Sequence, residues 1–417
     1  MTKNQTFFSP DYKITYSDIS TLKIAERQSI ILLTKLGDLH NRVLQTITSD
    51  LPQLSRELPY YNSEYISRLK EFAEDFKNKF NNIVVVGMGG GILNGMCLEG
   101  FSNKNDVNFI FCTTICASYL SGIKNRIDLN KTGFIFISNS GDTVETVVSA
   151  EYWYGALLSQ QITDFSDRFV FIYSAKNQSL LQDLHTTYGG KYFEYDRHMG
   201  GRFSTFTTPH ILIAAISGMD LDQLFEGANT TLNDFQSEKL SDSIYSGALF
   251  TTYNLNQYQN TAILIGSYNS ALHGLTKWYH TAIAETFGRE NINILPINLD
   301  LPIDQHGLMQ AVLTNNTGQN LNLFSIESCI NSKIDQVQKI MQSEVVEQGT
   351  AAGIPVREFI LKDNSPRTIG SFMMYLILET ITAGVLIDIN PFIQPQIDNL
   401  KQNIAKKYRQ YIQQGVP

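Results

Sequence analysis

Three hydroxyl side chains, on Ser138, Ser140 and Thr143, lie within the polar loop SNSGDT at residues 138–143. The apolar run 134–137 before it predicts a buried strand, and the segment after it carries apolar residues at helical spacing. The loop is therefore expected at a helix N-terminus, where free backbone N–H groups and the positive end of the helix dipole point outward. Hydroxyl donors and an internal glycine suit a phosphate monoester there. The alternative is a helix capped by Ser and Asp that binds no ligand.

A second glycine-rich turn, GMGGG at residues 87–91, follows an apolar strand candidate. Dinucleotide-binding proteins and many sugar-phosphate-binding proteins both use such a turn. A dinucleotide site also needs an acidic residue at the end of the next strand. Asp106 is near the expected distance, but it precedes the apolar run 107–112 instead of ending it, which disfavours a dinucleotide.

A third candidate is the segment GGR at residues 200–202. Gly200 and Gly201 permit an unusual backbone, and Arg202 is fixed directly behind them. The alternative is a glycine turn that carries a solvated arginine.

The overall charge narrows the classes of partner. The chain of 417 residues has a formal net charge of −8 at pH 7 and shows no long basic patch. Nucleic-acid binding normally needs such a patch, so it is not expected. The loop 138–143 itself contains neither Lys nor Arg, so its hydroxyls, backbone donors and helix dipole are expected to do most of the phosphate binding.

Cysteine usage and hydropathy favour a cytoplasmic globular protein. The four cysteines lie mostly in apolar surroundings, which suggests reduced thiols rather than a disulfide framework. They are Cys97, Cys112, Cys116 and Cys329, and none belongs to a pattern with metal-ligand spacing. The first residues lack the apolar core of a signal peptide. The apolar segment 369–386 contains Glu379, so we expect a helix that does not span a membrane.

The elements that must position these loops follow an alternating pattern. Short apolar runs at 107–112, 134–137, 169–173 and 192–195 are mostly separated by helical patterns, which predicts a parallel sheet with helices on both faces. Ligands bind such sheets outside the carboxyl ends of the strands, where both glycine-containing loops lie. Residues 1–80 are expected to be helical.

The pattern restarts later in the chain. The run AILIG at 262–266 and a helix at 271–287 repeat the first strand, turn and helix, and further strands are expected at 292–297, 321–326 and 354–361. We therefore expect two α/β domains of the same kind, related by a weak internal repeat.

Six motifs in order give the sequence a family resemblance. GMGGG, SNSGDTVET, GGRFS, ETFGR, DQHGLMQ and INPFIQPQIDNLK together resemble the phosphoglucose isomerase family of the sugar-isomerase (SIS) domain superfamily, over about residues 83–401. The resemblance implies two tandem three-layer αβα SIS domains, at 51–225 and 226–385. An N-terminal helical segment, 1–50, would precede them, and a C-terminal arm, 386–417, would follow. It also implies a homodimer that works without metal or cofactor.

The same resemblance implies roles for particular residues. Ser138, Ser140 and Thr143 would hold the substrate phosphate, and Arg202 would lie near the sugar C1 and C2 oxygens. Glu285 would be the catalytic base, and His306, donated by the neighbouring subunit and oriented by Glu145, would open the sugar ring. Lys401 on the C-terminal arm completes the catalytic set. The further substrate contacts are Gln394, Gly90, Gly91 and Gly201.

The chain departs from the family pattern at several positions. Gly91 replaces a serine and Asn139 replaces a lysine, so one hydroxyl and one positive charge are lost, and weaker phosphate affinity is expected. Ile393 and Gln396 are unusual in the motif that leads to Lys401.

These residues suit one reaction. An aldose–ketose isomerisation needs a base that moves a proton between adjacent carbons, donors for the enediolate oxygens, and groups that open the ring. Glu285 is a carboxylate, Arg202 stays protonated, and an imidazole such as His306 exchanges protons near neutrality. Taken singly, each of these residues is more often a solvated side chain. The remaining histidines, His40, His185, His198, His210, His273 and His280, are interpreted as structural.

The sequence therefore predicts the reversible isomerisation of glucose 6-phosphate and fructose 6-phosphate, a step of glycolysis and gluconeogenesis. One alternative is an isomerase for another sugar phosphate, such as mannose 6-phosphate. The other is a sugar-phosphate-binding regulator without turnover, which would need the loop 138–143 but not Glu285, His306 and Lys401 together.

Overall fold

The computed structural model describes residues 4–17, 38–49, 63–102, 107–175, 178–196, 199–252, 255, 261–289, 292–327 and 332–414. The chain divides into two compact units. The first unit takes in Tyr60–Leu221 and Gln394–Pro417, and the second takes in Met1–Pro59 and Asp222–Ile393.

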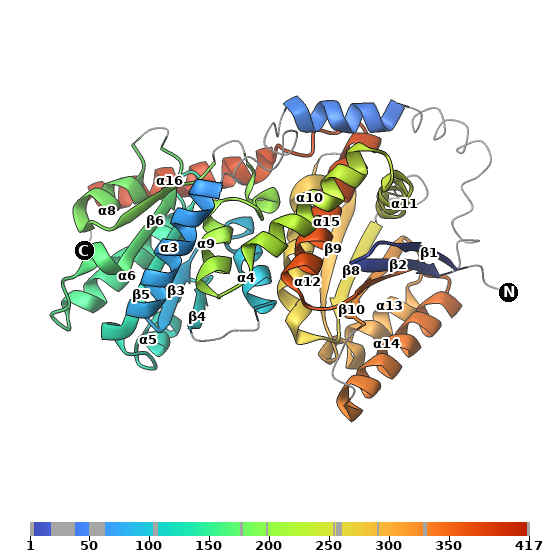
Figure 1. Cartoon of the computed structure of the whole chain (residues 1–417), viewed down its shortest axis with the longest axis horizontal. Coiled ribbons are helices and arrows are strands. Elements are labelled where there is room, and N and C mark those ends of the chain that lie inside the picture. The colour runs from blue at the N-terminus through green and yellow to red at the C-terminus, as the bar shows by residue number, and fades with distance from the viewer. Residues whose placement is uncertain are drawn as a thin grey trace. The chain divides into compact units, whose positions relative to one another are not determined.

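The first unit is built on a parallel sheet of five strands in the order β4-β3-β5-β6-β7 (Figure 1). Every neighbouring pair is parallel, as the alternating sequence pattern predicts. The strands are β3 (Asn82–Val86), β4 (Asn108–Cys112), β5 (Thr132–Ser138), β6 (Phe169–Tyr173) and β7 (Lys191–Glu194). The runs 134–137 and 169–173 are thus confirmed as strands, with β5 in the centre of the sheet.

Helices cover both faces of this sheet (Figure 1). On one face lie α3 (Ser63–Lys79), α4 (Gly90–Gly100) and α9 (Thr208–Ile216), and on the other lie α5 (Ala117–Lys124), α6 (Val144–Leu158) and α8 (Leu180–Tyr188). The short elements are η2 (Leu129–Lys131), α7 (Phe165–Arg168) and η3 (Gly201–Phe203). The last helix of this unit is α16 (Pro395–Gln413), which contacts α6.

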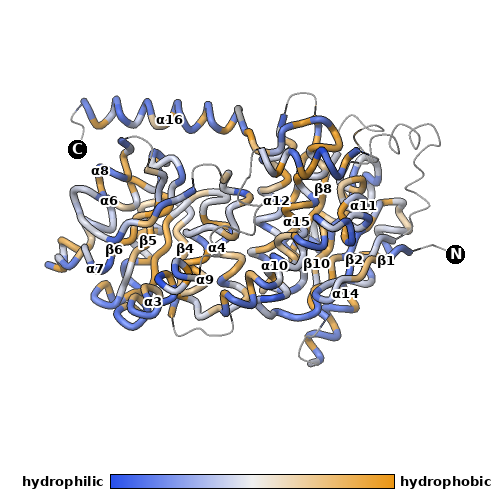
Figure 2. The backbone as a smooth tube through the Cα atoms, turned by 45° about the horizontal axis from the view of Figure 1, so that its top comes forward, coloured by the Kyte–Doolittle hydropathy of each residue, from blue (hydrophilic) through white to orange (hydrophobic). Residues whose placement is uncertain are grey.

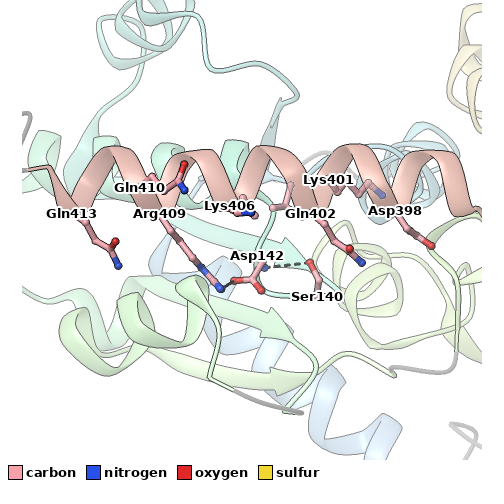
Figure 3. A pocket seen from close by; sticks show the side chains of 11 residues that line it. Ser140, Asp142, Asp398, Lys401, Gln402, Lys406, Arg409, Gln410 and Gln413 are labelled. Carbon is pink, nitrogen blue, oxygen red and sulfur yellow. Dashed lines mark hydrogen bonds and ion pairs between the residues drawn. The ribbon is translucent and has the colours of Figure 1, made fainter.

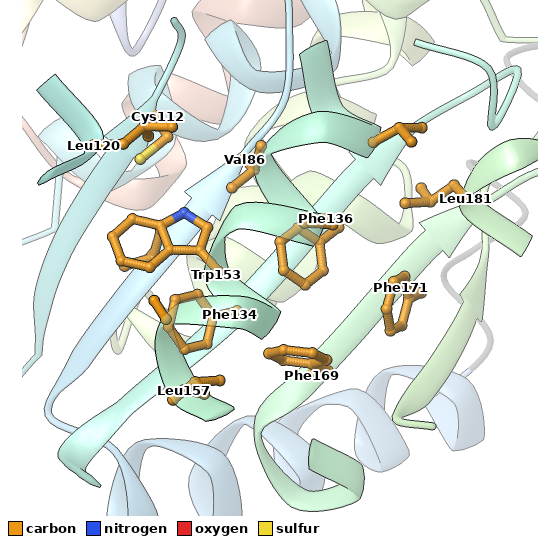
Figure 4. Packing of buried hydrophobic residues seen from close by; sticks show 14 of the residues in the cluster. Val86, Cys112, Leu120, Phe134, Phe136, Trp153, Leu157, Phe169, Phe171 and Leu181 are labelled. Atoms are coloured by element: carbon orange, nitrogen blue, oxygen red, sulfur yellow. The ribbon is translucent and has the colours of Figure 1, made fainter. Parts of the chain in front are cut away.

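Alternation along β5 divides its side chains between the two faces. Phe134 and Phe136 pack against α6, where the ring of Trp153 lies 5.2 Å from that of Phe134 (Figure 4). Phe169 of β6 meets both Phe rings edge-on. Complete burial of each such ring contributes about 1.5–3 kcal/mol. This core anchors the strand that ends in the loop 138–143, and Figure 2 shows the hydrophobic strands running through the unit.

The second unit carries a sheet of six strands in the order β1-β2-β11-β10-β8-β9. The strands are β1 (Gln5–Phe8), β2 (Tyr12–Ser17), β8 (Thr261–Ser267), β9 (Ile294–Asp300), β10 (Gln319–Ile326) and β11 (Val356–Leu361). Strands β8 to β11 are parallel, so a second α/β unit of the same kind is confirmed.

The N-terminal hairpin corrects the expectation that residues 1–80 are helical. Strands β1 and β2 pair with each other, and β2 adds antiparallel to β11, with Ile14 opposite Phe359. Buried and half-buried residues alternate along β2, with Tyr12, Ile14 and Tyr16 buried. That alternation is a strand signal with a period of two residues. Residues 38–49 and α3 are helical, whereas 18–37 and 50–62 lie outside the described residues.

Helices also cover the second sheet. They are α10 (Leu221–Gln236), α11 (Ser241–Thr252), α12 (His273–Phe287), α13 (Leu308–Thr314), α14 (Lys333–Ala351) and α15 (Pro366–Leu386), with the short turns η5 (Ser270–Leu272) and η6 (Ile303–His306). Within the described part of the chain, α15 alone is long and apolar enough to cross a membrane, but it is buried from Thr368 to Leu386. Its Glu379 pairs with Arg357 of β11 at 2.9 Å, and both are buried, which identifies α15 as a core helix.

Candidate active site

The loop 138–143 connects β5 to α6 in the first unit. Ser138 is buried at the end of β5, and its Oγ lies 2.9 Å from Oγ1 of Thr143 and accepts a hydrogen bond from the Gly141 N–H. Thr143 occupies the N-cap position of α6, yet its side chain makes no capping bond there. The arrangement therefore differs from a helix that is capped by its own hydroxyl, and it leaves the loop hydroxyls beside the helix N-terminus.

The side chain of Asn139 makes hydrogen bonds within the protein. Its side-chain N–H group donates to the Met199 carbonyl at 2.9 Å, and its side-chain oxygen accepts from Ser174 Oγ at 2.9 Å. A longer contact reaches the Asp196 carbonyl. Both the N–H group and the oxygen of this amide are therefore occupied by hydrogen bonds, and the bond to Met199 holds the segment that leads to Arg202.

The glycine-rich turn meets the GGR segment by direct backbone contact. A Cβ on Gly90 would lie 2.4 Å from the carbonyl carbon of Gly201 and 2.5 Å from the Arg202 nitrogen, so only glycine fits at position 90. Asn94 donates from one amide group to the carbonyls of both Gly90 and Gly201, at 2.6 and 2.8 Å. By contrast, a Cβ on Gly91 would meet nothing within 4 Å.

Arg202 is fully buried beneath this contact. Its guanidinium lies over the Phe203 ring and donates to Gln394 Oε1 at 3.0 Å. Gln394 is the N-cap residue of α16, so the hydrogen bond joins the arginine to the start of the C-terminal helix. A fixed, permanently charged group in such a place can stabilise an oxyanion.

A neutral histidine supports the same segment. Ser204 Oγ donates to the Gly201 carbonyl at 2.7 Å, accepts from Tyr195 and lies 2.9 Å from His210 Nε2. Because the single serine proton is used on Gly201, His210 Nε2 carries the proton that it donates to Ser204. Burial lowers the pKa of His210 to about 3, so the imidazole stays neutral. This agrees with the structural role expected for His210.

Helix α16 lies along the loop and forms a groove of about 630 Å³ with it (Figure 3). The loop contributes Ser140, Asp142 and Thr143, and the helix contributes a face that includes Lys401, Lys406 and Arg409. Arg409 pairs with Asp142 at 2.7 Å, and Tyr408 donates to Glu151 at 3.0 Å. The structure therefore places Lys401 in the same groove as two of the loop hydroxyls.

Two cationic residues of this groove, Lys406 and Arg409, were missed by the sequence reasoning. Helix α16 brings Lys401, Lys406 and Arg409 to the groove, so three cationic side chains line it together with the loop hydroxyls that are expected to do most of the phosphate binding. The available signal was the amphipathic pattern of 396–413, in which residues 401, 405 and 409 share one helical face.

Glu145, Glu285 and His306 are not among the residues that line this groove. Glu145 is half-buried in the first turn of α6. Glu285 is half-buried near the C-terminal end of α12, and His306 is exposed at the end of η6. Glu285 and His306 both belong to the second unit, whereas the remaining site residues belong to the first. His198 and Cys329 lie outside the described residues.

Known proteins resemble this chain over most of its length. A sequence model described as phosphoglucose isomerase matches residues 63–294. The glucose-6-phosphate isomerase of Mycoplasma capricolum is 26% identical over 424 residues, covering 94% of this chain and 97% of that protein. The enzyme of the same name from Acetivibrio thermocellus is 23% identical, with 82% and 84% covered.

Solved structures share the fold. The crystal structure of a hypothetical protein from Thermus thermophilus superposes with a TM-score of 0.79 at 21% identity, covering 98% of this chain and 100% of that one. A glucose-6-phosphate isomerase from Chlamydia trachomatis gives a TM-score of 0.73 at 17% identity, with 97% and 89% covered.

Proposed function

The chain belongs to the phosphoglucose isomerase family, and we propose that it interconverts glucose 6-phosphate and fructose 6-phosphate through the residues described above. The observation that carries this proposal is the groove that Ser140 and Thr143 of the loop line together with Lys401 of α16. It combines an anion-binding helix terminus with a cationic side chain that can act on the sugar.

The phosphate would be bound at the loop. Ser138, Ser140 and Thr143 offer hydroxyl donors, and the N-terminus of α6 offers backbone N–H groups and its dipole. Binding at a group that does not react would orient the sugar and lower the entropic cost of reaching the transition state.

Proton transfer would follow ring opening. His306 would donate a proton to the ring oxygen O5 as the C1–O5 bond breaks, while the O1 hydroxyl beside Lys401 releases its proton to water, which gives the open-chain aldose. Glu285 would then remove the C2 proton and return it to C1, and a proton passes between the O1 and O2 oxygens to complete the ketose. Arg202 would stabilise the negative charge of the enediolate, since it cannot lose its own proton under these conditions.

We propose that the working form is a cytoplasmic homodimer in which His306 serves the site of the neighbouring subunit. The exposure of His306 on η6 is compatible with such a contact. Mixing inactive His306→Ala and Glu285→Gln subunits should then restore up to about a quarter of the wild-type activity, because half of the dimers gain one intact site. No recovery after verified subunit exchange would contradict the shared site.

The test of the reaction is a coupled assay. Purified protein treated with EDTA receives fructose 6-phosphate, and the glucose 6-phosphate formed is followed through its dehydrogenase. We expect activity that resists the chelator. Thermal stabilisation by the sugar phosphate without turnover would instead identify a regulator, and turnover of mannose 6-phosphate alone would identify a different isomerase.

A further inference from the structure

The loop 138–143 lacks a positively charged side chain, and the structure shows that Asn139 is not free to bind a phosphate in its place. Asn139 occupies the position where the family resemblance expects a lysine. Its amide is engaged with Met199 on one side and Ser174 on the other. Turning this amide toward a ligand would break its hydrogen bonds to both buried residues and remove the N–H donor from the Met199 carbonyl, which is costly.

Asp142 adds a negative charge to the same loop. Asp142 lines the groove, where its carboxylate would repel a phosphate dianion. Two contacts draw this carboxylate aside: Arg409 pairs with it at 2.7 Å, and the Leu180 N–H of α8 donates to it at 3.1 Å. The charge of Arg409 is therefore used to neutralise Asp142.

Lys406 is a further cationic residue of the groove, beside Lys401 and Arg409. It lines the same groove as Ser140 and Thr143, and Figure 3 shows it above Ser140 and Asp142. Among the residues that the structure describes, no carboxylate forms an ion pair with it, whereas Arg409 has Asp142. An ammonium group without a partner is well suited to a phosphate ligand.

The order of groups along α16 agrees with this assignment. Gln394 at the start of the helix bonds Arg202, which is proposed to act at the C1 and C2 oxygens. Lys401 follows, and Lys406 lies about 7.5 Å further along the helix axis at 1.5 Å per residue. That separation is comparable to the length of a hexose 6-phosphate from O1 to phosphorus.

We propose that Lys406 binds the substrate phosphate and supplies the positive charge that the loop 138–143 lacks. This inference rests on the proposed function for the identity of the ligand, but the contact itself concerns any phosphate monoester or inorganic phosphate. Lys406 would thus be a substrate-binding residue on the C-terminal helix, distinct from Lys401.

The test compares Lys406→Met with Lys407→Met. Lys407 is the next residue on the same exposed helix but does not line the groove, so it controls for the loss of one charge. The measurements are KM and kcat for fructose 6-phosphate, and the Kd of inorganic phosphate by titration calorimetry. We expect Lys406→Met to raise both KM and Kd about 5- to 30-fold with kcat within about twofold, as for uniform binding of a charged group. Lys406→Arg should retain binding.

Each outcome is decisive for one of the two proposals. If Lys406→Met and Lys407→Met bind phosphate equally well, the role of Lys406 is wrong even when the wild type isomerises the sugar. If the wild type shows no turnover but its phosphate binding depends on Lys406, the reaction is wrong and the binding role stands. Circular dichroism of both variants verifies that they are folded.

Discussion

Arg202 donates a hydrogen bond to Gln394 at 3.0 Å and so connects a buried arginine behind the glycine turns to the N-cap residue of the C-terminal helix. One contact thereby sets the position of two proposed functional groups, the guanidinium and the face of α16 that carries Lys401. A substitution of Arg202 or of Gln394 would remove this hydrogen bond and is expected to displace both groups.

Replacement of Glu285 by Gln tests the proposed base. The amide keeps the size of the side chain but cannot accept the C2 proton, so kcat should fall about 10²- to 10⁴-fold. Glu347→Gln, an exposed change on α14, is the matched control and should leave kcat unaltered. A folded Glu285→Gln enzyme with near-native kcat would remove Glu285 from the mechanism.

Gly91→Ser should restore the hydroxyl that the family pattern carries at this position. The new side chain enters open space, since a Cβ at residue 91 meets nothing within 4 Å. If it faces the phosphate, one added hydrogen bond should lower KM for fructose 6-phosphate by about 2- to 10-fold.

Gly90→Ser provides the contrasting control for that change. Its Cβ would overlap the backbone of Gly201, so we expect a lower melting temperature and loss of activity. Equal effects of the two serines on KM and melting temperature would contradict the described packing of the glycine turns.

Removing one charge of the buried ion pair between Arg357 and Glu379 should destabilise the second unit more than removing an exposed charge. Glu379→Gln leaves Arg357 buried without a counterion and should lower the free energy of unfolding by about 3–5 kcal/mol. Glu344→Gln on exposed α14 should change it by less than about 0.5 kcal/mol. Urea denaturation of both variants measures the difference, and a similar loss in each would contradict the assigned burial.

The neutral His210 predicts a pH dependence of stability. Its pKa is about 3 in the folded protein, below the ordinary value of 6.5, so the unfolded chain takes up a proton that the folded chain does not. Stability should therefore fall as the pH decreases from about 6.5 toward 3, by up to about 1.4 kcal/mol per pH unit from this group. His210→Gln keeps an N–H donor for Ser204 and should show a shallower slope in urea denaturation. Parallel slopes for wild type and variant would contradict this account.

Much of the first unit could be predicted from local patterns. Short apolar runs bounded by polar loops locate β5 and β6 correctly, because both strands are covered on two faces and need no alternation. The hairpin of β1 and β2 was missed because a strand that pairs only with its neighbour and β11 depends on contacts far along the sequence. The alternation of Tyr12, Ile14 and Tyr16 was the one local signal for it.

In the candidate site, too, some features follow from the local sequence and others depend on distant contacts. The hydroxyls of the loop and the helix that follows them are local features, and motif order identified them. The tasks of Asn139 and Arg409 depend on tertiary partners, Met199 in one case and Asp142 in the other, which no spacing in the sequence specifies.

The pairing of β2 with β11 also constrains how the protein is made. During synthesis the N-terminal hairpin leaves the ribosome long before its partner strand, since nearly the whole chain separates Ser17 from Val356. Helix α16, which completes the first unit, is made later still. Each unit therefore acquires one of its elements, β11 or α16, only long after an earlier partner, β2 or α6, has been made, and such long sequence separations raise the contact order. Until β11 has been made, one edge of β2 has no partner strand. An unpaired strand edge can pair with other chains, so the hairpin is exposed to misassembly while the protein is produced.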